Sequence, residues 1–472
     1  MSTSAKPRLA QAAEPVEQAL YEIRRKIYPR AVTGKFAASR WFFVWATQLV
    51  FYGLPWLSWN GRQAVLFDLV HRKFYILGLV FWPQDVVYLT VLLIISAYSL
   101  FLFTAVAGRL WCGYACPQTV YTEIFLWIEK AIEGDRARRM KLDSAPLGGR
   151  KLALKAAKHA AWIAVALWTG FTFVGYFTPI RHLWAEAFTL SFGPWEWFWV
   201  NFYGLATYGN AGWLREQVCK HMCPYARFQS VMFDRDTLIV TYDGGRGEPR
   251  GSRSRSVDHR AKGLGDCVDC GICVQVCPTG IDIRDGLQYE CIGCAACIDG
   301  CNQVMDKVGY PRGLIRYASE NAVRDRLSFA GIVRRVLRPR ILVYTAILWA
   351  IILAAGYSLY QRVPVKVDVI RDRVASVRDA EEVENVYRLQ IMNTTEAPRR
   401  FLISVSGLPG LKISGGDAEV EIGAASSRMI PVRLQAPRQQ AKTGANPIVF
   451  TIQTAGEAEP VAIAEKASFV VQ

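Results

Sequence analysis

The chain has 472 residues, enough for several domains. It is 52% hydrophobic yet carries 20% charged residues and a formal net charge of +16, which argues against one uniform globular domain and for apolar blocks joined to charged soluble parts. The basic excess is accompanied by no nucleic-acid-binding motif, and it is explained more simply by Lys and Arg on the cytoplasmic flanks of membrane spans. The first 35 residues are polar and lack an apolar core, so we expect no cleavable signal peptide.

Apolar segments of spanning length predict a bundle of about five transmembrane helices, because a bilayer takes about 20 residues of helix. The predicted spans are residues 41–59, 85–107, 160–180, 195–214 and 341–360. Residues 1–40 would form a cytoplasmic arm, and residues 41–235 would hold the first four helices. Basic residues in 134–158 and 334–340 mark the cytoplasmic side. Residues 74–82 are too short to span and are expected to be re-entrant or interfacial.

Eight of the twelve cysteines lie in a short segment, in two sets with identical C-x2-C-x2-C-x3-C spacing. Three thiolates at this spacing can ligate one cubic cluster from a tight loop, and the fourth cysteine of each set ligates the other cluster in two-cluster bacterial ferredoxins. The spacing therefore predicts one [4Fe-4S] cluster on Cys267, Cys270, Cys273 and Cys301, and a second on Cys277, Cys291, Cys294 and Cys297. Residues 266–317 would form this cytoplasmic ferredoxin-like domain, after a mobile basic linker at 236–265 and before a basic connector at 318–340.

Zinc and disulfides are the alternatives for these eight cysteines. A zinc site takes four ligands in two pairs and has no use for the third and fourth cysteine of each set. Disulfides require an oxidising compartment, whereas this segment is expected on the cytoplasmic side.

The other four cysteines form two C-x3-C-P motifs, one after the second and one after the fourth predicted span. They are Cys112 and Cys116, then Cys219 and Cys223. The i, i+4 spacing puts each pair on one helical face if the backbone stays helical, and the proline would end or kink that turn. Thiolates favour Cu(I), zinc or iron–sulfur clusters, and His221 and Met222 add candidate copper ligands. Buried thiols or a resting disulfide are the plainer alternatives, and the spacing does not choose between metals.

Residues 361–472 have a different pattern, with short alternating apolar runs separated by Pro, Gly and Asn. Alternation with a period of two at regular intervals predicts an immunoglobulin-like β-sandwich. This part contains no cysteine and no histidine, so a docking or packing role is favoured over catalysis.

Several phrases of the sequence, among them WCGYACPQ, CKHMCPYARFQSVMFD, the double cysteine segment and PRGLIRY, closely resemble the FixG/RdxA/CcoG family of cytochrome c oxidase accessory proteins. The resemblance implies a multi-pass protein of the bacterial inner membrane that helps assemble the cbb-type oxidase, with the ferredoxin domain in the cytoplasm and the sandwich in the periplasm. It also implies reduction of Cu(II) to Cu(I), with the eight cysteines as cluster ligands and the C-x3-C-P pairs beside the membrane.

Three functions follow from these patterns. The first is a cupric reductase, an oxidoreductase with copper as substrate or transient ligand of the C-x3-C-P pairs. The second is a polyferredoxin subunit that exchanges electrons with quinone, because the paired motifs also resemble membrane subunits of nitrate and nitrous oxide reduction systems. The third is a non-catalytic assembly scaffold. Expected partners are the membrane, a cytoplasmic electron donor, and oxidase assembly factors, copper chaperones or exporters, without nucleic acid; a homodimer is left open.

Overall fold

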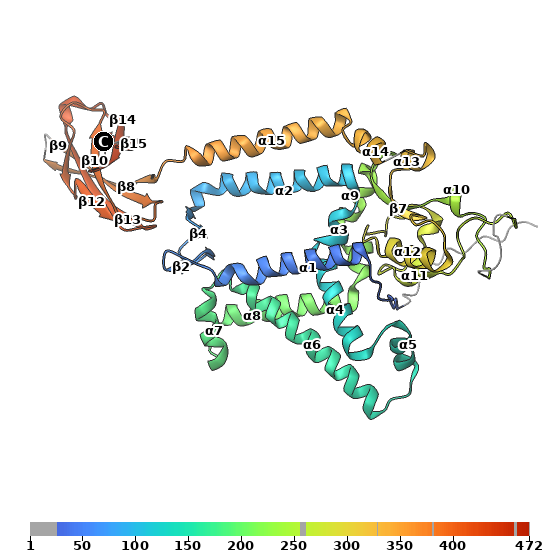
Figure 1. Ribbon diagram of the computed structural model, residues 1–472. Helices are drawn as coiled ribbons and strands as arrows, with labels where there is room; N and C mark the ends of the chain where they lie inside the picture. The colour runs from blue at the N-terminus through green and yellow to red at the C-terminus, as the bar shows by residue number, and fades with distance from the viewer. Residues whose placement is uncertain (1–25, 255–260, 328, 380–381, 457–459, 472) are drawn as a thin grey trace, which may run out of the picture.

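The computed structural model describes residues 26–254, 261–327, 329–379, 382–456 and 460–471. Long helices lie roughly side by side, with the cysteine-rich domain at one end of them and the β-sandwich at the other (Figure 1). The first 25 residues of the expected N-terminal arm lie outside the described part.

The long helices are the central layer of the molecule. They are α1 (Lys35–Gly53), α2 (Val86–Ala107), α6 (Gly149–Val174), α8 (Pro194–Thr207) and α15 (Pro339–Tyr360). Helix α2 packs along α15 and α6 packs along α8. The α2–α15 pair is tied at both ends, because Arg338 donates to the Ala105 carbonyl at 2.9 Å and Tyr88 donates to the Ser358 carbonyl at 3.2 Å.

Two helices in the described part are long and apolar enough to cross a membrane, Pro83–Ala107 and Pro339–Tyr360, with mean hydropathies of 2.4 and 2.0. Almost none of either apolar window is buried inside the protein, so these side chains face outward. Outward-facing apolar helices indicate contact with lipid. Helices α1, α6 and α8 do not meet the same criterion, so the predicted bundle of five spans stays a prediction.

Shorter helices connect these elements and surround their ends. They are α3 (Leu110–Tyr114), α4 (Pro117–Glu133), α5 (Arg136–Ser144), α7 (Ile180–Thr189), α9 (Pro224–Met232), α10 (Gly244–Gly247), α11 (Ile272–Gln275), α12 (Ala296–Val308), α13 (Glu320–Arg324) and α14 (Phe329–Val336). Two π-helices, η3 (Tyr208–Leu214) and η4 (Val218–Met222), follow α8, so the predicted fourth span loses regular α-helical geometry at residue 208.

The segment expected to be re-entrant or interfacial is β-structure instead. Strands β3 (Val65–Asp68), β4 (Lys73–Ile76) and β5 (Leu79–Phe81) form an antiparallel sheet, beside a hairpin of β1 (Ser58–Trp59) and β2 (Arg62–Gln63). Aromatic and β-branched residues favour strands, and a tight turn at residues 77–78 reverses the chain. Val80 and Trp82 pack on Met392, so this sheet contacts the sandwich.

The segment expected to be a mobile linker is partly built into the cysteine-rich domain. Strand β6 (Ile239–Tyr242) pairs antiparallel with β7 (Ile315–Ala318), across the whole cysteine segment. Arg246 then forms an ion pair with Asp266 at 2.5 Å. The ferredoxin-like domain therefore begins before residue 266, the predicted start. Local composition could not show this, because β6 pairs with a strand far along the chain. Residues 255–260 of that linker lie outside the described part.

The C-terminal part is a sandwich of two four-stranded antiparallel sheets, which confirms the immunoglobulin-like prediction. The sheets have the orders β12-β10-β14-β15 and β11-β13-β9-β8. The strands are β8 (Val365–Asp379), β9 (Glu382–Asn393), β10 (Arg399–Ser406), β11 (Lys412–Gly415), β12 (Glu419–Ile422), β13 (Ser427–Pro437), β14 (Gly444–Thr454) and β15 (Ala462–Val471). Tyr387, Phe401 and Phe450 are fully buried between the sheets, as inward-facing residues of alternating strands should be.

Candidate iron–sulfur and thiol sites

The two cysteine loops of the ferredoxin-like domain share one backbone conformation. Asp269 and Gly271 in the first loop have φ of 51° and 63°, and Gly293 and Ala295 at the equivalent positions have φ of 68° and 58°. All four lie in the left-handed region of backbone conformation, which is unfavourable for the two residues among them that carry a Cβ atom, Asp269 and Ala295. The repeated conformation turns backbone N–H groups toward the sulfurs: burial raises the pKa of Cys291 to about 11, and the N–H of Gly293 opposes part of this rise.

The eight cysteines surround two separate cavities. The first cavity is lined by Cys267, Cys270, Cys273 and Cys301. The second is lined by Cys277, Cys291, Cys294 and Cys297, and Cys273 lies between the two cavities and lines both. Each cavity thus gathers three cysteines of one set and the fourth of the other, as two-cluster ferredoxins require.

The cavities fit iron–sulfur groups on chemical grounds. Burial, together with the neighbouring Cys273, Cys270 and Cys267, raises the pKa of Cys301 to about 12. Burial likewise raises the pKa of Cys294 to about 12. Thiolates gathered in this way repel one another and are stable only with a cation among them, so these pockets suit a bound metal cluster.

The C-x3-C-P motifs do not form continuous helical faces. Cys112 lies in α3, which ends at Tyr114, and Cys116 is the extended N-cap residue of α4. In the second motif Cys219 lies in the π-helix η4 and Cys223 is the extended N-cap residue of α9. Each proline therefore begins a new helix at its first position, where its missing N–H costs nothing. The condition of a continuous helix is therefore not met and the pairs share no helical face, whereas the prolines end the preceding turn as expected.

The four thiols of these motifs, Cys112, Cys116, Cys219 and Cys223, nevertheless lie near enough for their charges to interact, and we call them the thiol site. In the described part of the chain no three His, Cys, Asp or Glu side chains are already arranged to hold one metal ion. Burial raises the pKa of Cys112 to about 12, and the nearby Cys116 and Cys219 contribute to the rise. Burial also raises the pKa of Cys116, with a further contribution from Cys223. All four are partly buried and none of the chain's twelve cysteines forms a disulfide.

Other groups around the thiol site divide into those that touch it and those that face away. The fully buried Gln229 donates from Nε2 to the Cys112 Sγ at 3.5 Å. The N–H groups of Gln118 and Thr119, in the first turn of α4, point to the Cys116 sulfur. His221 and Met222 are exposed, Met222 by 59%, so they are not enclosed with the four sulfurs.

The thiol site packs directly against the second cysteine cavity. Gly113, next to Cys112, approaches the backbone of Gly293 and Cys294 so closely that a Cβ atom would lie 2.8 Å from the Gly293 oxygen. Arg109 donates to the Cys291 carbonyl at 3.4 Å, and Tyr317 donates to the Gly293 carbonyl at 2.5 Å. This packing brings residues far apart in sequence into direct contact.

The first turn of α1 also binds the ferredoxin-like domain. The buried Asp299 carboxylate of α12 accepts a hydrogen bond from the Ala37 N–H at 2.8 Å, where the helix N-terminus favours negative charge. Arg40 donates to the Cys294 carbonyl at 2.6 Å. Gly113, Arg40 and Gln229 were not found from the sequence; only Gly113, between two cysteines of one motif, offered a local signal.

Similarities to known proteins extend over nearly the whole chain. Models of a 4Fe-4S dicluster domain, a 4Fe-4S binding domain and the Ig-like fold at the C-terminus of FixG match residues 214–320, 89–134 and 355–472. The nitrogen fixation protein FixG of Rhizobium meliloti is 37% identical over 463 residues, which cover 89% of this chain and 88% of that protein. The chain belongs to the FixG/RdxA family. Protein RdxA of Cereibacter sphaeroides is also 37% identical, over 96% of this chain and 99% of its own length.

More distant similarities involve parts of this FixG/RdxA family member. The ferredoxin-type protein NapH of Haemophilus influenzae is 26% identical over 46% of this chain and 68% of its own length. The crystal structure of a FixG-related protein from Vibrio parahaemolyticus covers 23% of this chain and 97% of that chain, at 23% identity and a TM-score of 0.21. Family membership and the matched domains make the chain a 4Fe-4S electron-transfer protein of an oxidoreductase family, and the apolar helices indicate a membrane protein.

Proposed function

We propose that this protein is a membrane-bound cupric reductase that supplies Cu(I) during assembly of the cbb-type cytochrome c oxidase. One observation carries the proposal: the thiol site lies against the backbone of the second cysteine cavity, at the contact of Gly113 with Cys294. An electron carrier in that cavity would have a soft-metal site as its immediate neighbour. Such an arrangement suits one-electron reduction of a metal ion that prefers sulfur when reduced.

In this proposal the eight cysteines of the two cavities hold the iron–sulfur groups. Cys267, Cys270, Cys273 and Cys301 hold one [4Fe-4S] cluster, and Cys277, Cys291, Cys294 and Cys297 hold the other. Bound clusters of this type supply one-electron transfer. The walls of the second cavity exclude water, and the backbone N–H groups of Gly293 and Ala296 point to the sulfurs of Cys291 and Cys294, where they stabilise negative charge.

The thiol site binds the substrate, Cu(II), which takes up one electron and becomes Cu(I). Thiolates are soft ligands that stabilise Cu(I) over Cu(II). Cys116 and Cys223 are each the N-cap residue of a helix, and the backbone N–H groups of Gln118 and Thr119 point to the Cys116 sulfur. Gln229 orients Cys112 through its 3.5 Å hydrogen bond.

We further propose that the protein is a multi-pass protein of the bacterial inner membrane, with the cysteine-rich domain in the cytoplasm and the sandwich in the periplasm. The two parts lie at opposite ends of the long helices, which supports this assignment (Figure 1). Arginines at the start of α15, on the side of the cysteine-rich domain, favour the cytoplasm there. The sandwich would then be the surface for oxidase assembly factors, copper chaperones or exporters, and a homodimer stays open.

The test is Cu(II) reduction by the anaerobically reconstituted full chain, with dithionite as reductant and a Cu(I)-specific chelator as reporter. The Cys112→Ala, Cys116→Ala double variant should keep its iron and lose most of the protein-dependent rate. The His221→Ala, Met222→Ala double variant is the matched control, because these residues lie in the same region but are exposed. An unchanged rate in the cysteine variant would remove the thiol site from the reaction.

A further inference from the structure

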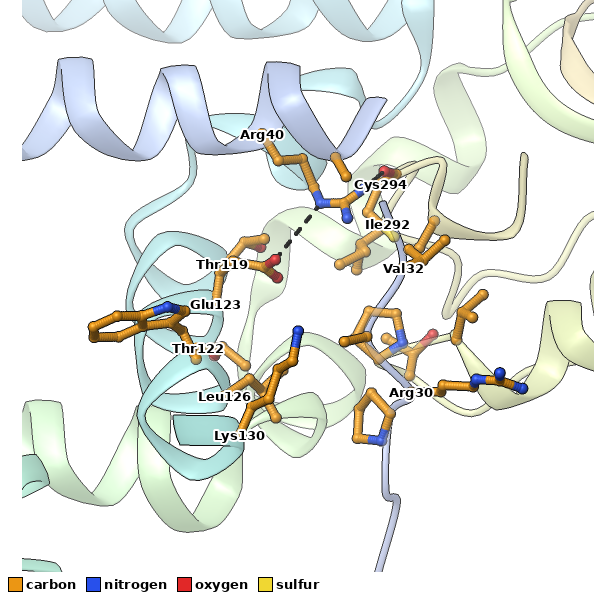
Figure 2. Close-up of a pocket in the computed structure, with 18 of the residues that line it drawn as sticks. Arg30, Val32, Arg40, Thr119, Thr122, Glu123, Leu126, Lys130, Ile292 and Cys294 are labelled. Carbon is orange, nitrogen blue, oxygen red and sulfur yellow. Dashed lines mark hydrogen bonds and ion pairs between the residues drawn. The ribbon is translucent and has the colours of Figure 1, made fainter. Parts of the chain in front are cut away.

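A larger cavity adjoins both the thiol site and the second cysteine cavity. Its volume is about 390 Å³, within the range of small-molecule sites. It lies between α1, α4, the extended segment 29–34 and the second cysteine loop (Figure 2). Cys219 and Cys294 both line it, so a molecule bound there would touch the thiol site and the second cysteine cavity.

The walls of the cavity combine an apolar surface with a few polar groups. Val32, Leu126 and Ile292 provide the apolar part. Arg40 reaches in from α1 toward Glu123 on α4, with 4.0 Å between the Arg40 Nε and the Glu123 Oε1 (Figure 2). The Arg40 side chain is 7% exposed and that of Glu123 is 27% exposed. The pair therefore offers a fixed hydrogen-bond donor beside a carboxylate that can exchange protons.

The mouth of the cavity lies where the apolar surface of the helices begins. Trp41 and Trp127 line the cavity and contact each other edge to face, with ring centroids 6.4 Å apart. The next turn of α1 presents Phe42 and Trp45, which are 67% and 63% exposed. Tryptophans at such a boundary are typical of the membrane–water interface, so lipid-soluble molecules have direct access.

We propose that this cavity binds the ring of a membrane quinol and that the quinol is the electron donor. This inference rests on the proposed cupric reductase function and names its reductant. Each quinol loses two electrons and two protons to become a quinone, while two Cu(II) ions become two Cu(I) ions. Glu123 accepts a proton from one quinol hydroxyl, and the Arg40 guanidinium stabilises the negative charge that develops on that oxygen. Glu123 passes this proton to water and then accepts the second one, so both protons leave to solvent.

The charge of the lining favours this ligand over a copper ion. Five cationic side chains line the cavity against three carboxylates. The cations are Arg30, Arg40, Lys130, Arg139 and Arg215, and the carboxylates are Glu123, Asp135 and Glu216. Arg139 and Arg215 are each paired with the buried Glu129, at 2.6 Å and 2.7 Å, so the lining is close to charge-balanced and suits a neutral quinol better than a Cu(II) ion.

Binding is tested without turnover, by calorimetric titration of the full chain in detergent with decylubiquinone. Ala38 lines the cavity and is exposed, so Ala38→Trp fills the cavity without disturbing a core. Ser39→Trp places the same side chain on the adjacent exposed residue, which is not among the lining residues. We expect the Kd of decylubiquinone to rise about tenfold or more in Ala38→Trp and to stay unchanged in Ser39→Trp. Equal affinity in both variants, or no saturable binding by the unmodified chain, would overturn the proposal.

The donor role is tested by Cu(II) reduction with decylubiquinol, dithionite or NADH as reductant. Glu123→Gln should lower the quinol-driven rate about a hundredfold, since a general base is lost, and leave the dithionite-driven rate unchanged. Glu186→Gln, on α7 away from the cavity, is the matched control and should alter neither rate. If NADH but not decylubiquinol drives the reaction, the quinol proposal is wrong. If dithionite fails as well, the reductase function is wrong, and the titration still decides whether the cavity binds quinone.

Discussion

A Cβ atom on Gly113 would lie 2.9 Å from the Cα atom of Cys294, so these residues pack backbone against backbone. Gly113 follows a cysteine of the thiol site, and Cys294 lines the second cysteine cavity. No side chain separates the two at this point. The contact therefore sets the separation between the proposed electron carrier and the proposed copper site.

Gly113→Ala should push the two sites apart, because the neighbouring atoms are backbone and cannot rotate away. We expect a loss of about 1–3 kcal/mol of unfolding free energy, typical of overpacking, and a several-fold slower dithionite-driven reduction of Cu(II) at unchanged iron content. Denaturation curves and the chelator assay measure both. Gly149→Ala in α6 is the control, since nothing lies within 4 Å of its Cβ position. A Gly113→Ala protein that matches this control would show that the contact is not needed.

Cys301→Ser should remove one cluster and leave the other. Cys301 belongs to the second cysteine set but lines the first cavity, with Cys267 and Cys270. The iron content should fall from about eight to about four atoms per chain, and the electron paramagnetic resonance signal of the remaining reduced cluster should lose its coupling to a neighbour. The Cys297→Ser variant should also hold about four iron atoms per chain. Its remaining cluster is the other one of the two, so its spectrum should differ from that of Cys301→Ser. Identical spectra of the remaining cluster in the two variants would contradict the assignment of ligands to cavities.

Asp85→Asn should loosen the sandwich from the long helices. The Asp85 side chain is 3% exposed and pairs with Arg362 at 2.6 Å and with Lys366. Removing its charge leaves two cations partly buried without an anion, which costs about 3 kcal/mol. Trypsin should cleave near residues 361–366 faster in this variant. Asp368→Asn, which loses only an exposed hydrogen bond from Gln84, should be cleaved at the original rate.

The Asp143→Asn substitution should make the stability of the fold depend less on pH under acidic conditions. Burial by itself raises the pKa of Asp143, but hydrogen bonds from Lys155, Lys26 and Tyr28 outweigh it and hold the pKa below its usual value. A carboxyl with a lowered folded-state pKa stabilises the fold fully above its unfolded pKa, and this stabilisation is lost as the pH falls through the folded-state value.

The measurement for Asp143 is thermal unfolding between about pH 6 and pH 2. The difference in Tm between the unmodified chain and Asp143→Asn should be largest near pH 6 and shrink toward pH 2. Asp417→Asn in an exposed turn of the sandwich is the control. A difference in Tm that does not change with pH would mean that the carboxylate charge has no part in holding residues 26–28 against α5.

The sequence by itself determined the features that depend on residues near one another in the chain. Spacing within each cysteine set predicted which four cysteines share a cavity, and alternation predicted the sandwich, because loop geometry and strand pleat repeat over a few residues. The most apolar segments predicted α2 and α15 for the same reason. Spacing alone did not predict how the cysteines of each C-x3-C-P motif are placed. The proline of each motif starts a new helix, so the two cysteines do not share the face of one continuous helix.

Only the tertiary structure decided which residues far apart in the sequence contact one another. It joined β6 to β7 around the ferredoxin-like domain, turned residues 65–81 into a sheet beneath the sandwich, and brought Gly113 against Cys294. It also formed the cavity between Arg40 and Glu123, residues that carry no motif. Such contacts depend on how the helices pack, and packing is set by the summed shape of many side chains, which no local pattern records.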